Sequence, residues 1–537
     1  LNFTMSDNKK RIFIYLPLIL SIIFVAGMFA GHYLPGGNSN FVHKVPLYNK
    51  LDAILGYIQE EYVDPISKDS LIEMAIPNIL QNLDPHSVYI PAAEFNEVND
   101  PLEGEFEGIG VEFNIQKDTI IVINVIKGGP SEKKGVMAGD RIVKINDTIV
   151  AGTKISNNDV VHKLKGKKNT SVKISVLRKS VKNLISFNIV RDKIPLYSVD
   201  ASFIVKKDIG YIKISKFAKN TLNEFRSAVS ELEKLGMKKI ILDLRENGGG
   251  YLDAATNLAD EFLKDGSLIV YTKGRAKPKV NTFATTGGFC ENQKLVILID
   301  EMSASASEIL AGAIQDNDRG TIIGRRSFGK GLVQEPVFFN DGSSLRLTVA
   351  RYYTPTGRCI QRSYKNGVMS YYEEIASRFH NGEIENKDSI KFNNSLKFKT
   401  PGGKIVYGGG GIMPDIFVPA DTTNITNYFR DAVNLALIYR FAFDYTDQNR
   451  NELKKFATWQ ELNIYLNNID VIKLFTDFAA KNNLPPDNFE IEKSKELLKT
   501  HIKALIIRNI FNDKGFYPIA LSIDNVFKTA VDYFGKK

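Results

Sequence analysis

The chain has 537 residues, too many for one ordinary domain, and its composition of 43% hydrophobic and 24% charged residues is that of a globular protein. The net charge of +9 is the difference between 70 Lys and Arg and 61 Asp and Glu scattered along the chain, so no basic stripe indicates a nucleic-acid partner. Two cysteines, Cys290 and Cys359, exclude a disulfide scaffold, and the six histidines show no ligand spacing, so we expect neither a metal nor a cofactor.

An uncharged apolar stretch, residues 12–34, follows Lys9, Lys10 and Arg11 and is long enough to cross a bilayer. The basic residues before it predict that residues 1–11 lie in the cytoplasm. A cleaved signal peptide is the alternative, but the stretch is longer than the apolar region of a typical signal peptide. We therefore expect a single-pass anchor in the inner membrane that leaves the rest of the chain in the periplasm, on the extracytoplasmic side.

Residues 47–98 have a helical pattern, with Leu51, Ile54, Leu55 and Ile58 at a spacing of three to four. The pattern changes over residues 99–190, where short β-rich runs alternate with Gly, Asn and Asp turns. These runs are residues 110–115, 119–125, 141–145 and 171–177.

Within residues 99–190, the segment Gly108-Ile109-Gly110-Val111 resembles the carboxylate-binding loop of PDZ domains, and Ala138-Gly139-Asp140-Arg141-Ile142 resembles their turn into the next strand. In PDZ domains, backbone N–H groups of this loop capture a chain-terminal carboxylate while an extended peptide joins the edge of the sheet. A plain β-turn is the alternative for the first segment, but the ordered set of segments favours a PDZ domain.

Residues 191–420 alternate strands with helices, which indicates an α/β layered domain. Buried-strand runs at residues 239–244 and 294–300 each lead through a turn into a predicted helix, over residues 252–263 and 306–315. Residues 421–537 are predicted to be mainly helical and carry no motif to which a chemistry can be attached.

The turn before the helix at residues 306–315 contains Ser303, Ser305 and Ser307. A nucleophile here would be exposed by the sharp turn, and free N–H groups of the helix start could hold an oxyanion. The alternative is structural, because Ser305 and Glu308 also form the pattern of a capping box.

Lys330 lies between Gly329 and Gly331, just before a β-rich run. A lysine can act as a general base when burial lowers its pKa from about 10.4 to near 7, which takes roughly 4 kcal/mol. The alternatives are a solvated turn lysine and a phosphate-binding loop over residues 324–330. The phosphate loop is disfavoured because Gly331 replaces the required Ser or Thr and a strand follows instead of a helix.

Together the motifs resemble those of the carboxy-terminal processing (tail-specific) peptidase family, in the same order and over residues 50–420. The matching segments are Leu83-Asp84-Pro85-His86-Ser87, Gly108-Ile109-Gly110-Val111, Asp243-Leu244-Arg245-Glu246-Asn247-Gly248-Gly249-Gly250, Ser303-Ala304-Ser305-Ala306-Ser307-Glu308-Ile309, Phe328-Gly329-Lys330-Gly331-Leu332-Val333-Gln334 and Tyr352-Tyr353-Thr354-Pro355-Thr356-Gly357-Arg358.

The resemblance implies a role for each matching residue. Ser305 corresponds to the nucleophile, Lys330 to the general base and Gln334 to the residue that orients the lysine. The backbone N–H of Ala306, with one from the glycine turn at Gly249, would form the oxyanion hole. The loop Gly108-Ile109-Gly110-Val111 would bind the substrate's carboxy terminus.

The resemblance also implies a crotonase-like α/β serine protease core with an inserted PDZ domain, to which this chain adds the membrane anchor and the helical extension. The expected partners are proteins with apolar carboxy termini, with a homo-oligomer or an adaptor protein left open. The chain departs from the family pattern at two positions. At Gly248 relatives often carry proline, and at Lys165 some relatives carry an arginine that couples tail binding to activity. A catalytically silent PDZ scaffold is the alternative function.

Overall fold

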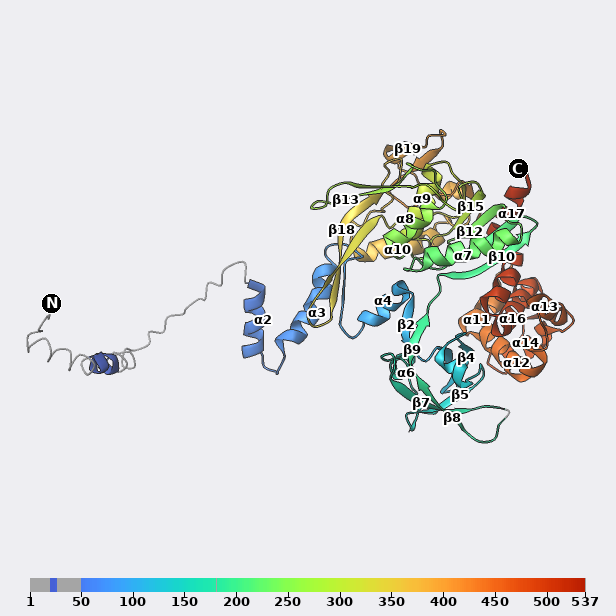
Figure 1. The fold of residues 1–537 in the computed structure, drawn as a ribbon, viewed down its shortest axis with the longest axis horizontal. Helices are drawn as coiled ribbons and strands as arrows, with labels where there is room; N and C mark the ends of the chain where they lie inside the picture. Colours follow the sequence, from blue (N-terminus) through green and yellow to red (C-terminus); the bar gives the residue numbers. More distant parts are fainter. Residues whose placement is uncertain (1–19, 27–49, 180, 537) are drawn as a thin grey trace, which may run out of the picture. The chain divides into compact units, whose positions relative to one another are not determined.

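The computed structural model describes residues 20–26, 50–179 and 181–536, and the chain divides into two compact units, residues 1–75 and 76–537 (Figure 1). In the first unit residues 20–26 are helical, and α2 (Lys50–Glu61) leads to α3 (Lys68–Leu80), which runs into the second unit. Most of the predicted membrane anchor, residues 12–34, lies outside the described residues. Among the residues that are described, no helix combines the length and apolar character that a bilayer crossing requires.

The second unit is built on a mixed six-stranded sheet in which β10 and β11 are antiparallel and the remaining neighbours are parallel. In spatial order its strands are β10 (Val199–Lys206), β11 (Ile209–Ile214), β12 (Lys239–Asp243), β15 (Lys294–Ile299), β16 (Thr321–Gly324) and β21 (Ile416–Phe417). The strand–helix alternation predicted the parallel part, since parallel neighbours need a crossover connection.

Helices cover both faces of this sheet. On one face α7 (Thr221–Lys234), α8 (Leu252–Asp260) and α9 (Ala306–Asp316) bury a large apolar core against alternate strand residues. On the other face α17 (Asn525–Lys536), at the end of the described chain, packs on the intervening strand residues. The sheet is therefore buried on both sides, as its continuous apolar strands require.

A second, antiparallel sheet carries the strand that follows Lys330. Its strands are β1 (Val88–Ile90), β13 (Leu268–Lys273), β14 (Val280–Phe283), β17 (Leu332–Phe338) and β18 (Ser344–Tyr353). The presence of β1 corrects the prediction that residues 47–98 are helical, because Val88–Ile90 pairs with β18. This strand has only three residues, too few to show a period, and it is fixed by its distant partner.

Residues 105–195 form a separate β-rich body inserted between α4 (Phe95–Glu103) and β10. Its sheet order is β3-β4-β5-β7-β8, with β6 paired to β5, and the strand pair β2–β9 closes the insertion. The elements are β2 (Glu105–Gly108), β3 (Val111–Gln116), β4 (Thr119–Val125), α5 (Pro130–Lys134), β5 (Arg141–Ile145), β6 (Thr148–Ile149), α6 (Asn157–Leu164), β7 (Ser171–Leu177), β8 (Ile185–Val190) and β9 (Asp192–Pro195). All four β-rich runs expected from the sequence are strands here.

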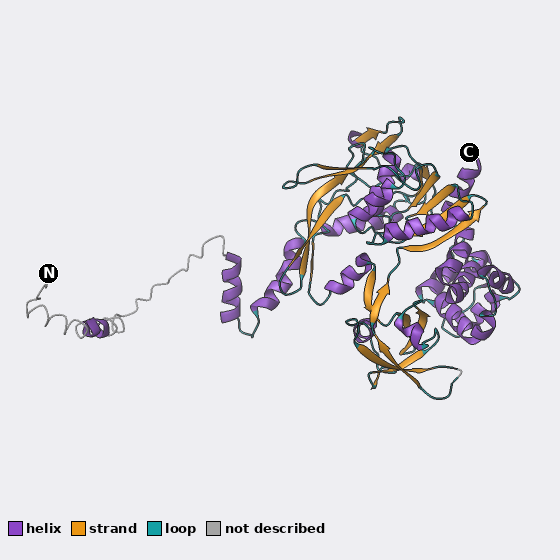
Figure 2. Ribbon diagram, in the orientation of Figure 1, coloured by secondary structure: helices purple, strands orange, loops and turns teal. Residues whose placement is uncertain are grey.

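The carboxy-terminal region folds as a helical bundle with its own apolar core (Figure 2). The helices are α11 (Asn427–Asn434), α12 (Leu437–Leu453), α13 (Trp459–Asn467), α14 (Val471–Ala480), α15 (Asn488–Lys493) and α16 (Lys495–Ala520). Along the chain, α10 (Val368–His380) and the hairpin of β19 (Lys397–Lys399) and β20 (Ile405–Tyr407) come after β18 and before the bundle. From the bundle the chain returns through a short 3₁₀ turn to α17 on the central sheet.

Candidate active site

Ser305 lies on a sharp turn between β15 and α9, immediately before the first residue of the helix. Its backbone angles are φ 54° and ψ −112°, a combination that a residue with a side chain adopts only under strain, at a cost of about 1–3 kcal/mol. Nucleophilic serines of other hydrolases are exposed on strained strand-to-helix turns of the same kind. The turn directs Ser305 into a cavity of about 330 Å³ that Lys330, Gln334 and Gly249 also line.

The two neighbouring serines have structural hydrogen bonds instead. Ser303 is fully buried and its hydroxyl donates to the Leu244 carbonyl at 2.8 Å. Ser307 is also fully buried and its hydroxyl donates to the Asn247 carbonyl at 2.9 Å. Of the three serines in the turn, only Ser305 lines the cavity, a distinction that the sequence alone could not make.

Lys330 enters the same cavity from the loop before β17, and its Nζ donates to Gln334 Oε1 at 3.1 Å. The amide nitrogen of Gln334 in turn donates to the His86 backbone carbonyl, which fixes the orientation of this side chain. No hydrogen bond joins Ser305 Oγ to Lys330 Nζ in this arrangement of the described residues. Hydrogen bonds between catalytic groups are often long or poorly aligned before substrate binds. The missing Ser305–Lys330 bond is therefore compatible with a catalytic pair that forms in the complex with substrate.

The surroundings of Lys330 favour its neutral form. Burial lowers the pKa of Lys330 below its ordinary range, and the positive charge of Arg346 lowers it further. Glu308 and Asp84 oppose this shift without cancelling it. A lowered pKa increases the fraction of neutral lysine, the form that can act as a general base.

Glu308 joins the nucleophile turn to the lysine loop, a role that the capping-box pattern alone did not reveal. Its Oε2 accepts from the Ser305 N–H at 2.9 Å and from the Lys330 N–H at 2.8 Å, and its Oε1 accepts from the Gly329 N–H at 2.6 Å. The Ser327 hydroxyl also donates to Oε1. The carboxylate is fully buried, and this burial raises the pKa of Glu308 while the four donors oppose the rise.

Tyr352 also joins the Ser305 turn to the Lys330 loop, through the backbone carbonyls of these two residues. Its hydroxyl lies 2.8 Å from the Lys330 carbonyl oxygen and 3.1 Å from that of Ser305, so one phenol donor serves both acceptors. Glu308 therefore holds the N–H groups of Ser305 and Lys330, and Tyr352 holds their carbonyls.

His86, distant in the sequence, lies close to Lys330 in the fold. Burial, together with the charge of Lys330, lowers the pKa of His86 to about 3, so its ring is neutral at physiological pH. The ring Nε2 is 2.9 Å from the Tyr371 hydroxyl. His86 thus contributes its backbone carbonyl to the site, and its ring is directed to Tyr371 and not to the serine.

The glycine turn packs directly against the nucleophile. A Cβ on Gly249, where φ is +105°, would lie 2.8 Å from Ser305 Cβ and 3.0 Å from the Ala306 nitrogen, so only glycine fits. As the first residue of α9, Ala306 has no helical partner for its N–H, whereas the next three N–H groups donate to carbonyls of Ala304 and Ser305. Its N–H is thus the unused donor at this helix start.

The second predicted oxyanion donor is already engaged. The Gly249 N–H donates to Asn247 Oδ1 at 2.9 Å, and Asn247 is itself fully buried and donates to the Ile214 carbonyl. An oxyanion at this position would have to share or replace the Asn247 contact. The prediction that Gly249 donates to an oxyanion therefore needs a rearrangement of this turn.

The predicted peptide-binding loop, Gly108-Ile109-Gly110-Val111, connects β2 to β3 and is not part of the catalytic cavity. The Ile109 side chain is buried in the core of the inserted body, so only the backbone of this residue can meet a ligand. Gly110 has a φ of +74°, and the carbonyls of Ile109 and Gly110 accept from the Ser131 and Ile126 N–H groups. Lys165 pairs with Asp100 of α4 at 2.8 Å and also lies outside the cavity.

Both cysteines are free, Cys290 in the core and Cys359 in the wall of a second cavity.

Comparison with known families matches three segments of the chain. Residues 208–370 match Peptidase family S41, and residues 108–189 match the PDZ domain. Residues 428–512 match a family of unknown function, and they cover most of the helical bundle.

Two curated relatives are similar over the region of the motifs. A carboxy-terminal-processing protease of Bartonella bacilliformis is 38% identical over 309 residues, which cover 57% of this chain and 70% of the relative. The carboxy-terminal processing protease CtpB of Bacillus subtilis is 35% identical over 323 residues, which cover 60% of this chain and 66% of the relative.

Among solved structures, a photosystem II D1 C-terminal processing protease is 26% identical, with a TM-score of 0.35, and the match covers 71% of this chain and 95% of that one. The PDZ domain of a carboxy-terminal protease from Vibrio cholerae in complex with peptide is 33% identical, with a TM-score of 0.16, and the match covers 17% of this chain and 99% of that one.

Proposed function

The chain belongs to peptidase family S41, with a protease core and a PDZ domain related to those of the carboxy-terminal processing serine proteases, and we propose that it is an endopeptidase using Ser305 and Lys330 as a catalytic dyad. The observation that carries the proposal is that a strained, cavity-facing serine shares its cavity with a buried lysine of lowered pKa. Both belong to segments that one carboxylate, Glu308, holds together.

The chemistry proceeds through an acyl-enzyme. The neutral Lys330 amine takes the proton of the Ser305 hydroxyl as its Oγ attacks the substrate carbonyl, and the resulting oxyanion is held by the Ala306 N–H and a donor of the glycine turn. The protonated lysine then gives its proton to the leaving amine. Water, activated by the same lysine, hydrolyses the acyl-enzyme and releases the product.

The test is cleavage of an unfolded reporter with an apolar carboxy terminus by the full chain and by single variants. Ser305→Ala and Lys330→Ala should each lower kcat by at least about 10³-fold, because the two side chains act in one proton transfer and the loss of either one prevents it. Lys330→Arg should be equally inactive, since a guanidinium stays protonated. Lys454→Ala, at an exposed lysine outside the site, should keep full activity, and thermal unfolding should show that every variant is folded. Activity retained in the Ser305 or Lys330 variants would refute the dyad.

Substrate choice and location complete the proposal. The loop Gly108-Ile109-Gly110-Val111 would bind apolar carboxy termini of substrates through its backbone N–H groups, since the carbonyls of Ile109 and Gly110 already accept from the Ser131 and Ile126 N–H groups. The core would be crotonase-like. The apolar stretch at residues 12–34 would anchor the chain in the inner membrane with the protease in the periplasm.

A silent PDZ scaffold is the second candidate, because within the described residues Lys330 Nζ donates to Gln334 and not to Ser305 Oγ, and the Gly249 N–H is engaged by Asn247. This candidate predicts binding of tail peptides with no turnover by the wild type, even when membrane extract is added as a source of an activator. Turnover that is lost in Ser305→Ala would eliminate it.

A further inference from the structure

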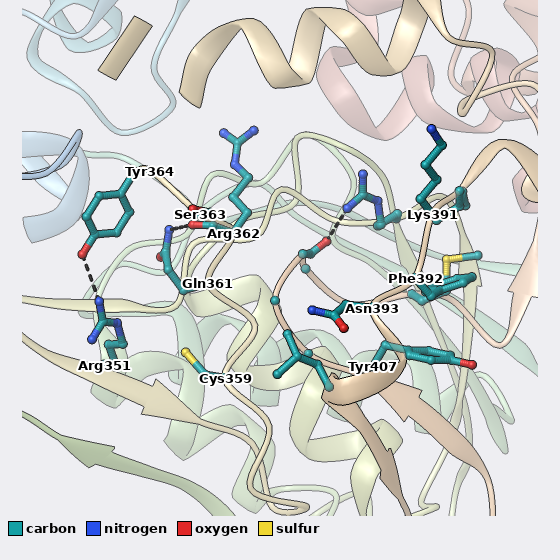
Figure 3. Close-up of a pocket in the computed structure, with 18 of the residues that line it drawn as sticks. Arg351, Cys359, Gln361, Arg362, Ser363, Tyr364, Lys391, Phe392, Asn393 and Tyr407 are labelled. Carbon is teal, nitrogen blue, oxygen red and sulfur yellow. Dashed lines mark hydrogen bonds between the residues drawn. The ribbon is translucent and has the colours of Figure 1, made fainter. Parts of the chain in front are cut away.

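A second cavity, of about 600 Å³, lies beside the protease core and is separate from the catalytic cavity (Figure 3). Its walls come from β18, from the loop at residues 359–365, from the loop at residues 390–393 and from the glycine run at residues 408–411. This volume is in the range of ordinary ligand sites. None of the catalytic residues lines it.

The cavity wall is strongly cationic. It includes five basic side chains, Arg326, Arg351, Arg362, Lys365 and Lys391, and no carboxylate among the residues that the structure describes. Arg351, Lys365 and Lys391 also have no ion-pair partner within that described part of the chain, and Arg351 donates only to the Tyr364 hydroxyl at 3.1 Å (Figure 3). Cations that line one cavity without a counter-charge favour an anionic ligand.

An arginine cluster formed by two wall residues and Arg378 adds to this potential. In the described part of the chain, Arg326, Arg362 and Arg378 pair with two carboxylates, Glu374 and Glu383, so one positive charge is left over. Arg362 is 4% exposed, and its Nε and Nη2 have no hydrogen-bond partner in the described chain. Its Nη1 pairs with Glu374, and the guanidinium stacks on aromatic rings, at 4.1 Å from the Phe328 ring centre and 3.9 Å from that of Tyr371.

The same cavity has an apolar side. Phe392 stacks on Tyr407 with ring centres 4.3 Å apart, and Leu396 and Met413 lie in the same wall (Figure 3). A simple inorganic anion would use the cations and leave this surface without contact. A ligand that carries both carboxylates and apolar groups would use both parts.

The cavity also shares a wall with the lysine loop. The Gly331 N–H, next to Lys330, donates to Gln361 Oε1 at 2.7 Å, and Gln361 lines the second cavity. Arg362, the next residue, is the one that stacks on Phe328 at the start of the lysine loop. A chain bound here would therefore lie against the back of the loop that holds the catalytic base.

We propose that this cavity binds an acidic segment of polypeptide, with Asp or Glu carboxylates against Arg351, Lys365 and Lys391 and apolar side chains against Phe392 and Leu396. The choice of a peptide as the ligand rests on the proposed function, whereas the anionic character of the ligand rests on the wall itself. The cavity serves as a second contact for a substrate or regulatory peptide, distinct from the loop that recognises carboxy termini.

The experiment measures fluorescence anisotropy of a short labelled peptide of Glu, Leu and Ser, with an amidated carboxy terminus that cannot use the carboxylate-binding loop. The full chain carries Ser305→Ala, which should prevent cleavage, and an anisotropy change that persists without loss of the intact peptide reports binding whether or not Ser305 is the nucleophile. Arg351→Gln with Lys391→Gln should weaken binding by about tenfold or more, and a peptide with Gln in place of Glu should bind as weakly. Raising the salt concentration should weaken binding of the Glu peptide by the wild-type cavity.

The matched control is Arg275→Gln with Lys454→Gln, which removes the same charge from exposed residues outside the cavity and should leave binding unchanged. Equal losses in both double variants would refute the site, because attraction would then be a property of the net charge. Equal binding of the Glu and Gln peptides would also refute it. If inorganic phosphate or vesicles with anionic lipid bind through the same residues while the peptide does not, the peptide proposal is wrong.

Discussion

At the scale of single residues, the site depends on side chains that do not react but that fix the backbone of the two reacting residues. Glu308 and Tyr352 contact the peptide units of both Ser305 and Lys330, although these residues belong to different segments of the chain. Buried, fully hydrogen-bonded groups of this kind fix geometry more than they add to stability. The sequence showed Glu308 only as a capping residue, because a capping pattern says nothing of a second segment.

Replacing Glu308 with Gln should therefore affect the rate more than binding. Glutamine keeps one acceptor oxygen but turns an NH₂ group toward N–H donors, which displaces the Ser305 turn or the Lys330 loop. We expect kcat to fall by about 10²-fold with little change in KM, since a misplacement of about 1 Å costs that much. Steady-state kinetics with the unfolded reporter would measure this.

Glu301→Gln is the matched control, because Glu301 is also buried but pairs with Arg325, away from the cavity. It should lose about 1–3 kcal/mol of stability at unchanged kcat. A Glu308→Gln enzyme with the kcat of the wild type would show that the link is not needed for catalysis.

The charge of Arg346 should shift the pH at which the enzyme becomes active. Burial is the larger cause of the lowered pKa of Lys330, and the repulsion of Arg346 lowers that pKa further. Arg346→Met removes the repulsion, which raises the pKa of Lys330 and moves the acid limb of kcat/KM to higher pH. Arg346→Lys keeps the charge and should leave the limb near its original position. A pH profile that is the same in all three enzymes would mean that Lys330 is not the titrating base.

At the scale of elements, the strands of the PDZ domain and of the parallel sheet could be predicted because each has a local pattern and bounding turn residues. The three-residue β1 could not, because its pairing with β18 lies far along the chain. Periodicity likewise predicted helices after residue 421 but not which of them would pack on the protease. In the structure it is α17, which places Val526, Phe527, Ala530 and Phe534 on the central sheet.

Phe527 tests the contribution of α17. Its ring contacts Tyr211 edge to face, with ring centres 5.6 Å apart, and the side chain is 8% exposed. Phe527→Ala should lower the free energy of unfolding by about 3–5 kcal/mol, as expected for a buried aromatic residue. Phe489→Ala, at a position that is 80% exposed, should change it by no more than about 0.5 kcal/mol. Equal effects in a denaturant titration would contradict the packing of α17.

At the scale of the whole molecule, a carboxylate of the helical bundle forms ion pairs with the PDZ domain. Asp447 of α12 has a side chain that is 7% exposed and lies 3.0 Å from Arg141 Nη2 and 2.6 Å from Lys179 Nζ. Both cations belong to the PDZ domain. Burial alone would raise the pKa of Asp447, but the ion pairs with Lys179 and Arg141 hold it below its usual range. The bundle therefore restrains the body that is proposed to recognise substrates.

Asp447→Asn should loosen this contact. Removing the charge leaves Arg141 and Lys179 without an ion-pair partner. We expect amide hydrogen exchange at Gly139 and Asp140 to become about tenfold faster, which corresponds to a decrease of about 1.4 kcal/mol in the free energy of local opening. Hydrogen–deuterium exchange followed by mass spectrometry would measure it. Asp431→Asn, in the same bundle but without an ion pair in the described chain, should leave this exchange unchanged. Unchanged exchange in Asp447→Asn would show that the ion pairs do not restrain the PDZ domain.

The position of α17 also bears on the order in which the protein is made. The strands of the central sheet are complete once Phe417 has been added, yet the apolar face of the sheet stays uncovered until α17, from Asn525 onward, has been synthesised. The growing chain therefore passes through a stage in which the parts of the catalytic site exist but the sheet beneath them is half buried. We therefore expect proteolytic activity to appear only after this late helix has been synthesised.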